Sequence, residues 1–195
     1  GCIRAMFVAL AISAAGADHI ISMKLHSDQE QGFFNFPMDN VSTESLFSEY
    51  FGQKKIKNLI VVAPDVGSAK DAKRFADKLA APLAIINKTR AAHNQSEVSH
   101  VVGDVKGKTC VIYDDMVDTA GSVEGAVKAL RAMGVGKDIY LAATHAVFSG
   151  PAISRLRGAG FKEVVISNTI PISAAKHFPG LKILSVAPLL AQIIK

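Results

Sequence analysis

Short apolar runs alternate with segments of helical periodicity over most of this sequence, and that alternation limits the folds the chain can adopt. Apolar runs at 58–63, 83–87, 109–113, 139–144 and 164–167 have the length of buried strands. The clearest helical pattern, at 66–79, places Ala72, Phe75 and Leu79 on one face. Strands that alternate with helices predict an α/β fold, in which a mostly parallel, twisted sheet is flanked by helices on both faces.

The flanking segments are less regular. We expect a helix over 2–15, a strand over 19–25, a loop over 27–42 and a short helix over 43–52. The pattern predicts further strands at 98–102 and 183–186, and further helices after residue 122, at 150–157 and at 188–194. This order keeps the alternation of strand and helix through most of the chain.

Polar residues stand where several of the predicted strands end. Because ligands of open parallel sheets bind outside the carboxyl ends of the strands, such residues are candidates for a binding site. In chain order they are His26, Asp65, Lys88, Asp114 and Thr144. We therefore expect one site at this edge of the sheet.

The stretch VIYDDMVDTAGS, residues 111–122, has the most specific pattern in the chain. An apolar strand is followed by the adjacent acids Asp114 and Asp115, then by a small-residue loop, and then by a helix. The free N–H groups at a helix N-terminus favour a phosphate, and paired carboxylates can accept bonds from sugar hydroxyls or hold a hydrated Mg²⁺. The stretch therefore predicts a sugar-phosphate site, unless Asp118 or Thr119 only caps the helix.

Six segments carry a resemblance to a known family. They read KLHSDQEQGFF, PDVG, NKTR, VIYDDMVDTAGS, THAVFSGP and SNTIP, in that order. Together they resemble the ribose-phosphate diphosphokinases (PRPP synthetases), which have a type I phosphoribosyltransferase-like fold. A phosphoribosyltransferase that uses PRPP would share only the 111–122 stretch. The resemblance implies a reaction in which the diphosphoryl group of Mg²⁺–ATP moves to the 1-hydroxyl of ribose 5-phosphate, giving PRPP and AMP.

The resemblance also implies residue roles. The 5-phosphate would be held by Asp118, Thr119, Ala120, Gly121 and Ser122, and the ribose hydroxyls by Asp114 and Asp115. His26 and Asp65 would be the metal-binding residues, and Lys88 and Arg90 would neutralise charge on the transferred phosphates. Each residue also has a simpler interpretation: a loop histidine, a helix cap at Asp65, and solvated charges at Lys88 and Arg90. His145 is expected to have a structural or supporting role.

The sequence departs from the family pattern in two respects. Members of the family usually begin with about 100 residues or more of a first domain, which include most of the adenine site, and this sequence lacks them before Gly1. In addition, Lys24 stands where the family usually has an acid. We therefore expect residues 1–41 to be the remnant of an N-terminal phosphoribosyltransferase-like domain on which 186–195 packs, and 42–185 to be a second such domain. The chain alone is expected to have little activity.

Composition narrows the function classes. No run of about 18 apolar residues is present, so we expect no membrane span. A net charge of +5, spread along 195 residues, suits an anionic substrate and does not favour nucleic acid. The two cysteines have neither metal nor pairing spacing, which favours a reducing, cytoplasmic setting.

The expected partners are ATP, ribose 5-phosphate and further copies of the chain, since the family forms dimers that build to hexamers. Two other functions stay open: a non-catalytic, synthetase-like regulatory subunit that binds sugar phosphate or nucleotide, and a phosphoribosyltransferase that uses PRPP.

Overall fold

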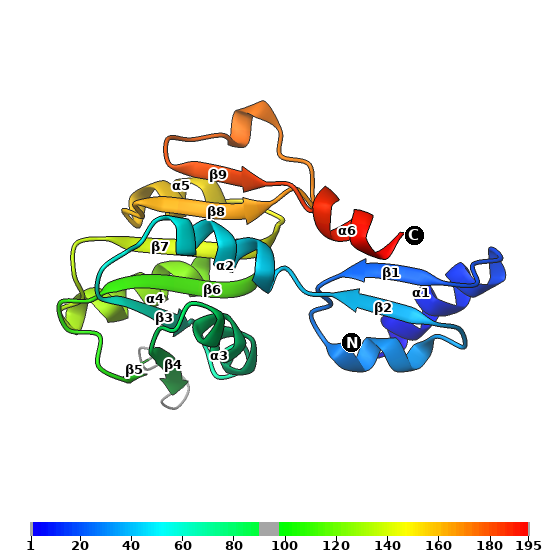
Figure 1. The fold of residues 1–195 in the computed structure, drawn as a ribbon, viewed down its shortest axis with the longest axis horizontal. Coiled ribbons are helices and arrows are strands. Elements are labelled where there is room, and N and C mark those ends of the chain that lie inside the picture. Colours follow the sequence, from blue (N-terminus) through cyan, green and yellow to red (C-terminus); the bar gives the residue numbers. More distant parts are fainter. Residues whose placement is uncertain (1, 90–97, 195) are drawn as a thin grey trace. The chain divides into compact units, whose positions relative to one another are not determined.

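The chain forms two units, Gly1–Thr43 and Glu44–Lys195, in a computed structural model that describes residues 2–89 and 98–194 (Figure 1). The smaller unit contains α1 (Cys2–Ala14), β1 (Ile20–Met23), the 3₁₀ helix η1 (Asp28–Phe33) and β2 (Met38–Val41). β1 and β2 pair in parallel, with Ile20 opposite Met38. The predicted loop over 27–42 is therefore wrong at η1 and β2. The short run MDNV has little strand character of its own and becomes a strand because β1 supplies its pairing partner.

The larger unit contains the rest of the elements. They are α2 (Glu44–Gln53), β3 (Leu59–Ala63), α3 (Ala69–Lys78), β4 (Leu83–Thr89), β5 (Val98–Val102), β6 (Thr109–Val117), α4 (Gly121–Ala132), β7 (Ile139–Ala146), α5 (Ala152–Gly158), β8 (Glu163–Ser167), η2 (Ala174–Lys176), β9 (Leu181–Leu184) and α6 (Ala187–Ile193). The strands form one seven-stranded sheet in the order β5-β4-β3-β6-β7-β8-β9. All neighbours in it are parallel except β4 and β5. The predicted α/β fold with a mostly parallel sheet is confirmed.

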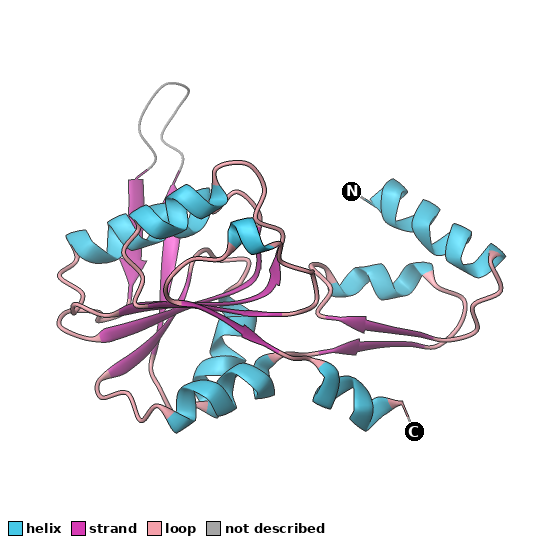
Figure 2. Ribbon diagram, turned by 90° about the horizontal axis from the view of Figure 1, so that it is seen from above, coloured by secondary structure: helices cyan, strands magenta, loops and turns pink. Residues whose placement is uncertain are grey.

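Each face of this sheet has its own core, because successive residues of a strand point to opposite faces. On one face Cys110 and Ile112 pack with Val123 and Leu130 of α4 and with Leu156 of α5. The other face carries Val111 and Tyr113, together with aromatic side chains of α2 and α3: Phe47, Phe51 and Phe75. Figure 2 shows helices on both sides of the sheet. Burial on both faces explains why the strands are continuous apolar runs in the sequence.

Cys110 lies within this core as a free, buried thiol. Its burial raises the pKa of the thiol to about 12, so the group behaves as a small apolar side chain. In the described part of the chain, the helices fall short of the length and apolar character needed to cross a bilayer.

Candidate functional site

β6 is a central strand, and its carboxyl end extends beyond that of β3. It pairs with β3 only up to Ile112, whereas its pairing with β7 continues to Val117, opposite Ala146. Asp114 and Asp115 therefore lie inside the strand, and the sequence-based expectation that the strand ends before them is wrong. Pairing with β7 explains the difference, since a neighbouring strand can hold residues whose own strand propensity is low.

The two carboxylates of β6 repel each other in a partly buried setting. The backbone N–H of Asp115 donates to Oδ1 of Asp114 over 3.0 Å. Burial, followed by the charge of Asp115 and with a contribution from Asp65, raises the pKa of Asp114 to about 8. The structure thus brings three predicted site residues within electrostatic reach of one another: Asp65, Asp114 and Asp115. At neutral pH, Asp114 keeps a proton unless a ligand or cation compensates its charge.

The chain bends over residues 118–120, between β6 and α4, and three successive carbonyl groups there are held by hydrogen bonds. Val117 O accepts from the N–H groups of Val147 and Phe148, each at 3.1 Å. Asp118 O accepts from the N–H of Ser149 at 3.0 Å, and Thr119 O accepts from Nη1 of Arg155 at 3.0 Å. A trans peptide points its C=O and N–H in opposite directions. The N–H groups of residues 118–120 are therefore aimed away from the segment 147–155.

α4 begins at Gly121 without a side-chain cap in the described structure. Ala120 occupies the N-cap position with φ 60° and ψ 14°, and no side-chain capping hydrogen bond is made there. This contradicts the alternative in which Asp118 or Thr119 caps the helix. A non-glycine residue in the left-handed region costs of order 1 kcal/mol and is often found at binding sites. The bend and the helix start together present backbone donors suited to an anion such as phosphate.

Asp65 lies between β3 and α3, where it has a structural role. Its Oδ1 accepts the N–H of Ser68 at 2.9 Å, and the Ser68 hydroxyl donates to the Asp65 carbonyl at 3.1 Å. These bonds shape the turn that leads into α3, whose N-cap position is occupied by Ser68 and not by Asp65. The charge of Asp65 also contributes, after burial and Asp115, to the raised pKa of Asp114.

Three further residues were predicted to belong to the site: Lys88, Arg90 and His26. Lys88 was expected in a loop, but it lies in β4, paired with Ser99 of β5. Arg90 lies outside the described residues. His26 is an exposed residue on the bend between β1 and η1 in the smaller unit. The metal-binding and charge-neutralising roles of these residues stay predictions.

The end of β7 carries a hydroxyl and imidazole network that the sequence pattern did not reveal. Nδ1 of His145 lies 2.9 Å from Oγ1 of Thr169. The Thr169 hydroxyl donates to the carbonyl of the buried Thr144 at 3.1 Å, and the Ser167 hydroxyl donates to the same carbonyl at 2.7 Å. These bonds join the ends of β7 and β8, which supports the structural role expected for His145. Arg155 was also missed, because 36 residues separate it from the carbonyl that it binds.

The acidic groups suit Mg²⁺ only as part of a site that water and substrate phosphates complete. Within the described ranges, 2–89 and 98–194, no cluster of three or more His, Cys, Asp or Glu side chains could hold a metal ion. Mg²⁺ commonly takes one or two carboxylates and completes its shell with water and substrate phosphates. Asp114 and Asp115 provide the hard oxygen ligands that such an ion prefers.

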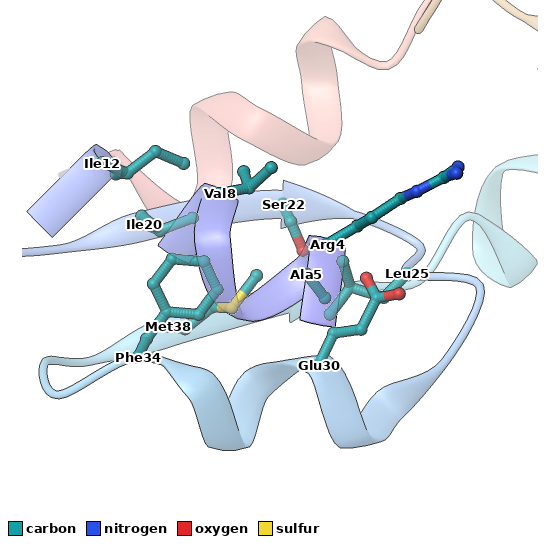
Figure 3. A pocket seen from close by; sticks show the side chains of 10 residues that line it. All are labelled: Arg4, Ala5, Val8, Ile12, Ile20, Ser22, Leu25, Glu30, Phe34 and Met38. Carbon is teal, nitrogen blue, oxygen red and sulfur yellow. The ribbon is translucent and has the colours of Figure 1, made fainter. Parts of the chain in front are cut away.

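A separate cavity of about 420 Å³ lies within the smaller unit (Figure 3). Its lining is mainly apolar, from α1, β1, β2 and the residues around η1: Arg4, Ala5, Val8, Ile12, Ile20, Ser22, Leu25, Glu30, Phe34 and Met38. None of the predicted site residues belongs to it. A mainly apolar lining does not suit the polyanionic ligands that the sequence analysis predicts.

Comparisons with known proteins identify the family of the chain. The profile of the family described as "Phosphoribosyl transferase domain" matches residues 42–171. The chain is 50% identical over 194 residues to the ribose-phosphate pyrophosphokinase of Synechococcus elongatus, covering 98% of this chain and 58% of that protein. The corresponding enzyme of Synechocystis sp. is 49% identical over 193 residues, with the same two shares.

A solved structure is also similar over nearly the whole chain. The crystal structure of phosphoribosylpyrophosphate synthetase from Mycobacterium smegmatis superposes with a TM-score of 0.91 at 47% identity, covering 98% of this chain and 62% of that one. The superposition confirms the fold class predicted from the sequence. The chain thus spans 58% to 62% of the length of these relatives.

Proposed function

Because this chain belongs to the phosphoribosyl transferase domain family, we propose that it provides the ribose 5-phosphate part of a ribose-phosphate diphosphokinase site. One observation carries the proposal. A backbone anion cradle at 118–122 adjoins the acids of β6, in a chain about half identical to ribose-phosphate pyrophosphokinases. Family membership by itself would also allow a PRPP-using phosphoribosyltransferase. The identity over 98% of the chain favours the diphosphokinase.

In the proposed complex, the 5-phosphate binds at the bend and the start of α4. The N–H groups of residues 118–122 and the hydroxyls of Thr119 and Ser122 donate to it, and the positive end of the α4 dipole adds to the attraction. Asp114 and Asp115 accept hydrogen bonds from the 2- and 3-hydroxyls of the ribose. This arrangement fixes the sugar by both ends and leaves its 1-hydroxyl exposed for attack on the β-phosphorus of ATP. Such positioning is a main source of rate in phosphoryl-type transfer.

The charge of the transferred diphosphoryl group must be neutralised. A bound Mg²⁺ would supply positive charge to the phosphate oxygens. Asp114 and Asp115 of β6 are the carboxylates that would hold it. The metal-binding roles of Asp65 and His26 are separate proposals that rest on the family resemblance. Lys88 and Arg90 would compensate the negative charge that develops during transfer.

The first test removes the polar side chains of the bend. Asp118→Ala combined with Thr119→Ala is expected to weaken ribose 5-phosphate binding by more than about 1 kcal/mol, because hydrogen bonds to a phosphate are each of about that size. Isothermal titration calorimetry measures the change. Asp104→Ala combined with Ser45→Ala is the matched control, since both residues are exposed and Asp104 precedes the opposite end of β6.

Two outcomes would count against the proposal. If the unmodified chain does not bind ribose 5-phosphate, the proposed function is wrong. If it binds and the double variant binds equally well, the side chains of the bend have no part in phosphate recognition. Turnover, measured as AMP release from ATP, ribose 5-phosphate and Mg²⁺, is expected to be low for the 195-residue chain alone.

A non-catalytic, synthetase-like subunit is the second candidate function, and Lys24 favours it. This buried residue, with φ 43°, donates from Nζ to the carbonyl of Leu25 at 2.9 Å and places a cation two residues before His26. A regulatory subunit would bind sugar phosphate and co-purify with a catalytic homologue. A chain that associates only with copies of itself would rule this function out.

A further inference from the structure

Arg155 joins α5 to the back of the proposed phosphate cradle. Its Nη1 donates to the carbonyl of Thr119 at 3.0 Å, and its Nε lies 3.4 Å from Oε2 of Glu124 in the first turn of α4. The guanidinium therefore contacts both the bend before the helix and the helix itself. About a third of the side chain is exposed, so solvent only partly screens these contacts.

Gly121 leaves space for the guanidinium of Arg155. A Cβ placed on Gly121 would lie 3.3 Å from Nη1 of Arg155, which is tighter than an ordinary van der Waals contact. The absence of a side chain at the first residue of α4 thus leaves room for Arg155 to reach the Thr119 carbonyl. The family resemblance places Gly121 among the residues that would hold the 5-phosphate, and the approach of Arg155 is a second reason for a glycine at this position.

The contact with Thr119 completes a series. The carbonyls of Val117 and Asp118 are held by backbone N–H groups from residues 147–149, and the Thr119 carbonyl is the next in line. Arg155 is the side chain that holds it. Since the peptide between Thr119 and Ala120 is rigid and trans, fixing this carbonyl also fixes the direction of the Ala120 N–H. Ala120 is the residue with φ 60°, a conformation that its own side chain does not favour and that external contacts must stabilise.

We infer that Arg155 is a positioning residue for ribose 5-phosphate binding: by holding the Thr119 carbonyl it aims the backbone N–H groups of the bend at the 5-phosphate. This inference rests on the proposed function. Arg155 does not contact the phosphate itself, because it lies on the side of the bend toward which the carbonyls point. Its effect should therefore be confined to the phosphate half of the substrate, and it should not depend on the sugar hydroxyls.

The simpler interpretation is that Arg155 forms a surface ion pair with Glu124 and helps only to pack α5 against α4. Exposed pairs of this kind contribute little to stability, and their loss should not change ligand affinity. The two interpretations are separated by measuring ligand affinity together with hydrogen exchange at the backbone amides that donate to the carbonyls of the bend.

The test compares Arg155→Gln, Arg155→Lys and a control in the 195-residue chain. Arg155→Gln is expected to weaken ribose 5-phosphate binding about ten-fold, because donors that are slightly misplaced bind their anion much less well. Inorganic phosphate, titrated by NMR, should lose affinity by the same factor, since only the phosphate cradle is affected. Arg155→Lys keeps the charge and one donor, but not the planar fork, and should recover part of the affinity.

Arg131→Gln is the matched control. Arg131 lies on α4, lines the same surface cavity as Arg155, and also donates to backbone carbonyls: to Gly136 at 2.7 Å and to Lys137 at 2.9 Å. Those carbonyls follow the other end of α4, so this substitution should leave the affinity nearly unchanged. Thermal unfolding of each variant establishes that it is folded at the titration temperature.

Hydrogen exchange in the unliganded chain tests the effect of Arg155 on the bend without using the substrate. Hydrogen exchange at the amides of residues 147–149, which donate to the carbonyls of Val117 and Asp118, should be faster in Arg155→Gln than in the unmodified chain and in Arg131→Gln. Weaker binding together with faster exchange would support the inference. If the unmodified chain binds ribose 5-phosphate and Arg155→Gln binds it equally well, the inference is wrong and the proposed function stands. If the unmodified chain does not bind, the proposed function is wrong and the inference falls with it.

Discussion

Asp114 combines two properties that are rarely compatible in a side chain: it lies in a central strand of a sheet, and it is ionisable. Burial and the charges of Asp115 and Asp65 make its carboxylate form unfavourable, which raises the pKa to about 8. Carboxyl groups that are this costly to ionise in the folded protein are typical of functional sites. In the proposed complex, sugar hydroxyls or Mg²⁺ would compensate the charge that the protein itself leaves uncompensated.

The raised pKa predicts how stability depends on pH. Between about pH 4, the ordinary pKa of an aspartate, and about pH 8, the folded state keeps a proton that the unfolded state releases. Stability contributed by this group is therefore greatest below about pH 4, falls through that window, and levels off above it. Asp114→Asn removes the titration and can still accept the bond from Asp115. The difference in Tm between this variant and the unmodified chain should grow from pH 5 to pH 8.

Thermal unfolding at pH 5, 6, 7, 8 and 9 measures this difference. Asp118→Asn, an exposed acid on the following bend, controls for the change in net charge. A difference that stays constant over this range would show that Asp114 is ionised throughout.

At the scale of elements, β6, the bend and α4 act as one strand–loop–helix element that is anchored at both ends. Near the helix start, the backbone of 147–149 and Arg155 hold the bend. Beyond the helix end, the N–H of Gly136 donates to the carbonyl of Lys108, just before β6, at 2.8 Å. The second anchor sets where α4 lies along β6, and it therefore helps to place the helix N-terminus at the carboxyl end of the strand.

Gly136 is the critical residue of that second anchor. A Cβ at this position would lie 2.7 Å from the Lys108 carbonyl oxygen, a contact that neither backbone segment can relieve without moving. Gly136→Ala is therefore expected to lower the free energy of unfolding by roughly 1–3 kcal/mol, as other overpacking substitutions do. Urea unfolding followed by circular dichroism measures the change.

The same substitution elsewhere in the element provides the control. Gly125 lies within α4, and a Cβ there would meet nothing within 4 Å. Gly125→Ala should therefore stabilise the protein by up to about 1 kcal/mol, because alanine has the higher helix propensity. If both substitutions changed stability in the same direction, close approach at Gly136 would not be the cause.

At the scale of the whole molecule, the two units have very different means of stabilisation. Glu44–Lys195 has a seven-stranded sheet with a core on each face. Gly1–Thr43 has one two-stranded sheet, and on α1 it exposes large apolar side chains: Ile3, Met6, Phe7, Val8 and Leu10. A sheet of two strands is at best marginally stable in water. We therefore expect residues 1–43 to be at best marginally stable as a separate peptide.

This difference predicts how separate fragments behave. A fragment of residues 42–195 should unfold cooperatively on heating and keep its affinity for ribose 5-phosphate, since the cradle and the β6 acids all lie in the larger unit. A peptide of residues 1–43 should lack a cooperative transition. Circular dichroism melts and calorimetric titration test both statements. A cooperatively folded peptide, or a fragment 42–195 that melts without a transition, would contradict them.

The α/β class, the positions of most strands and helices, and the strand–loop–helix stretch at 111–122 could be predicted from the amino-acid sequence. These features depend on local periodicity and on residue types that neighbouring positions share. The domain boundaries and the roles of His26, Lys88 and Arg90 remain predictions, because they rest on the family resemblance.

Which segments are neighbours could be known only from the folded structure. It made β2 a strand by pairing it with β1, and it extended β6 through Asp114 and Asp115 by pairing it with β7. It also raised the pKa of Asp114 and placed Arg155 against the carbonyl of Thr119. Pairing, burial and contact between residues far apart in the chain are properties of the packed sheet, and local sequence does not encode them. The cradle at 118–122 can therefore be predicted as a motif, but the directions of its N–H donors depend on α5 and on the backbone that follows β7.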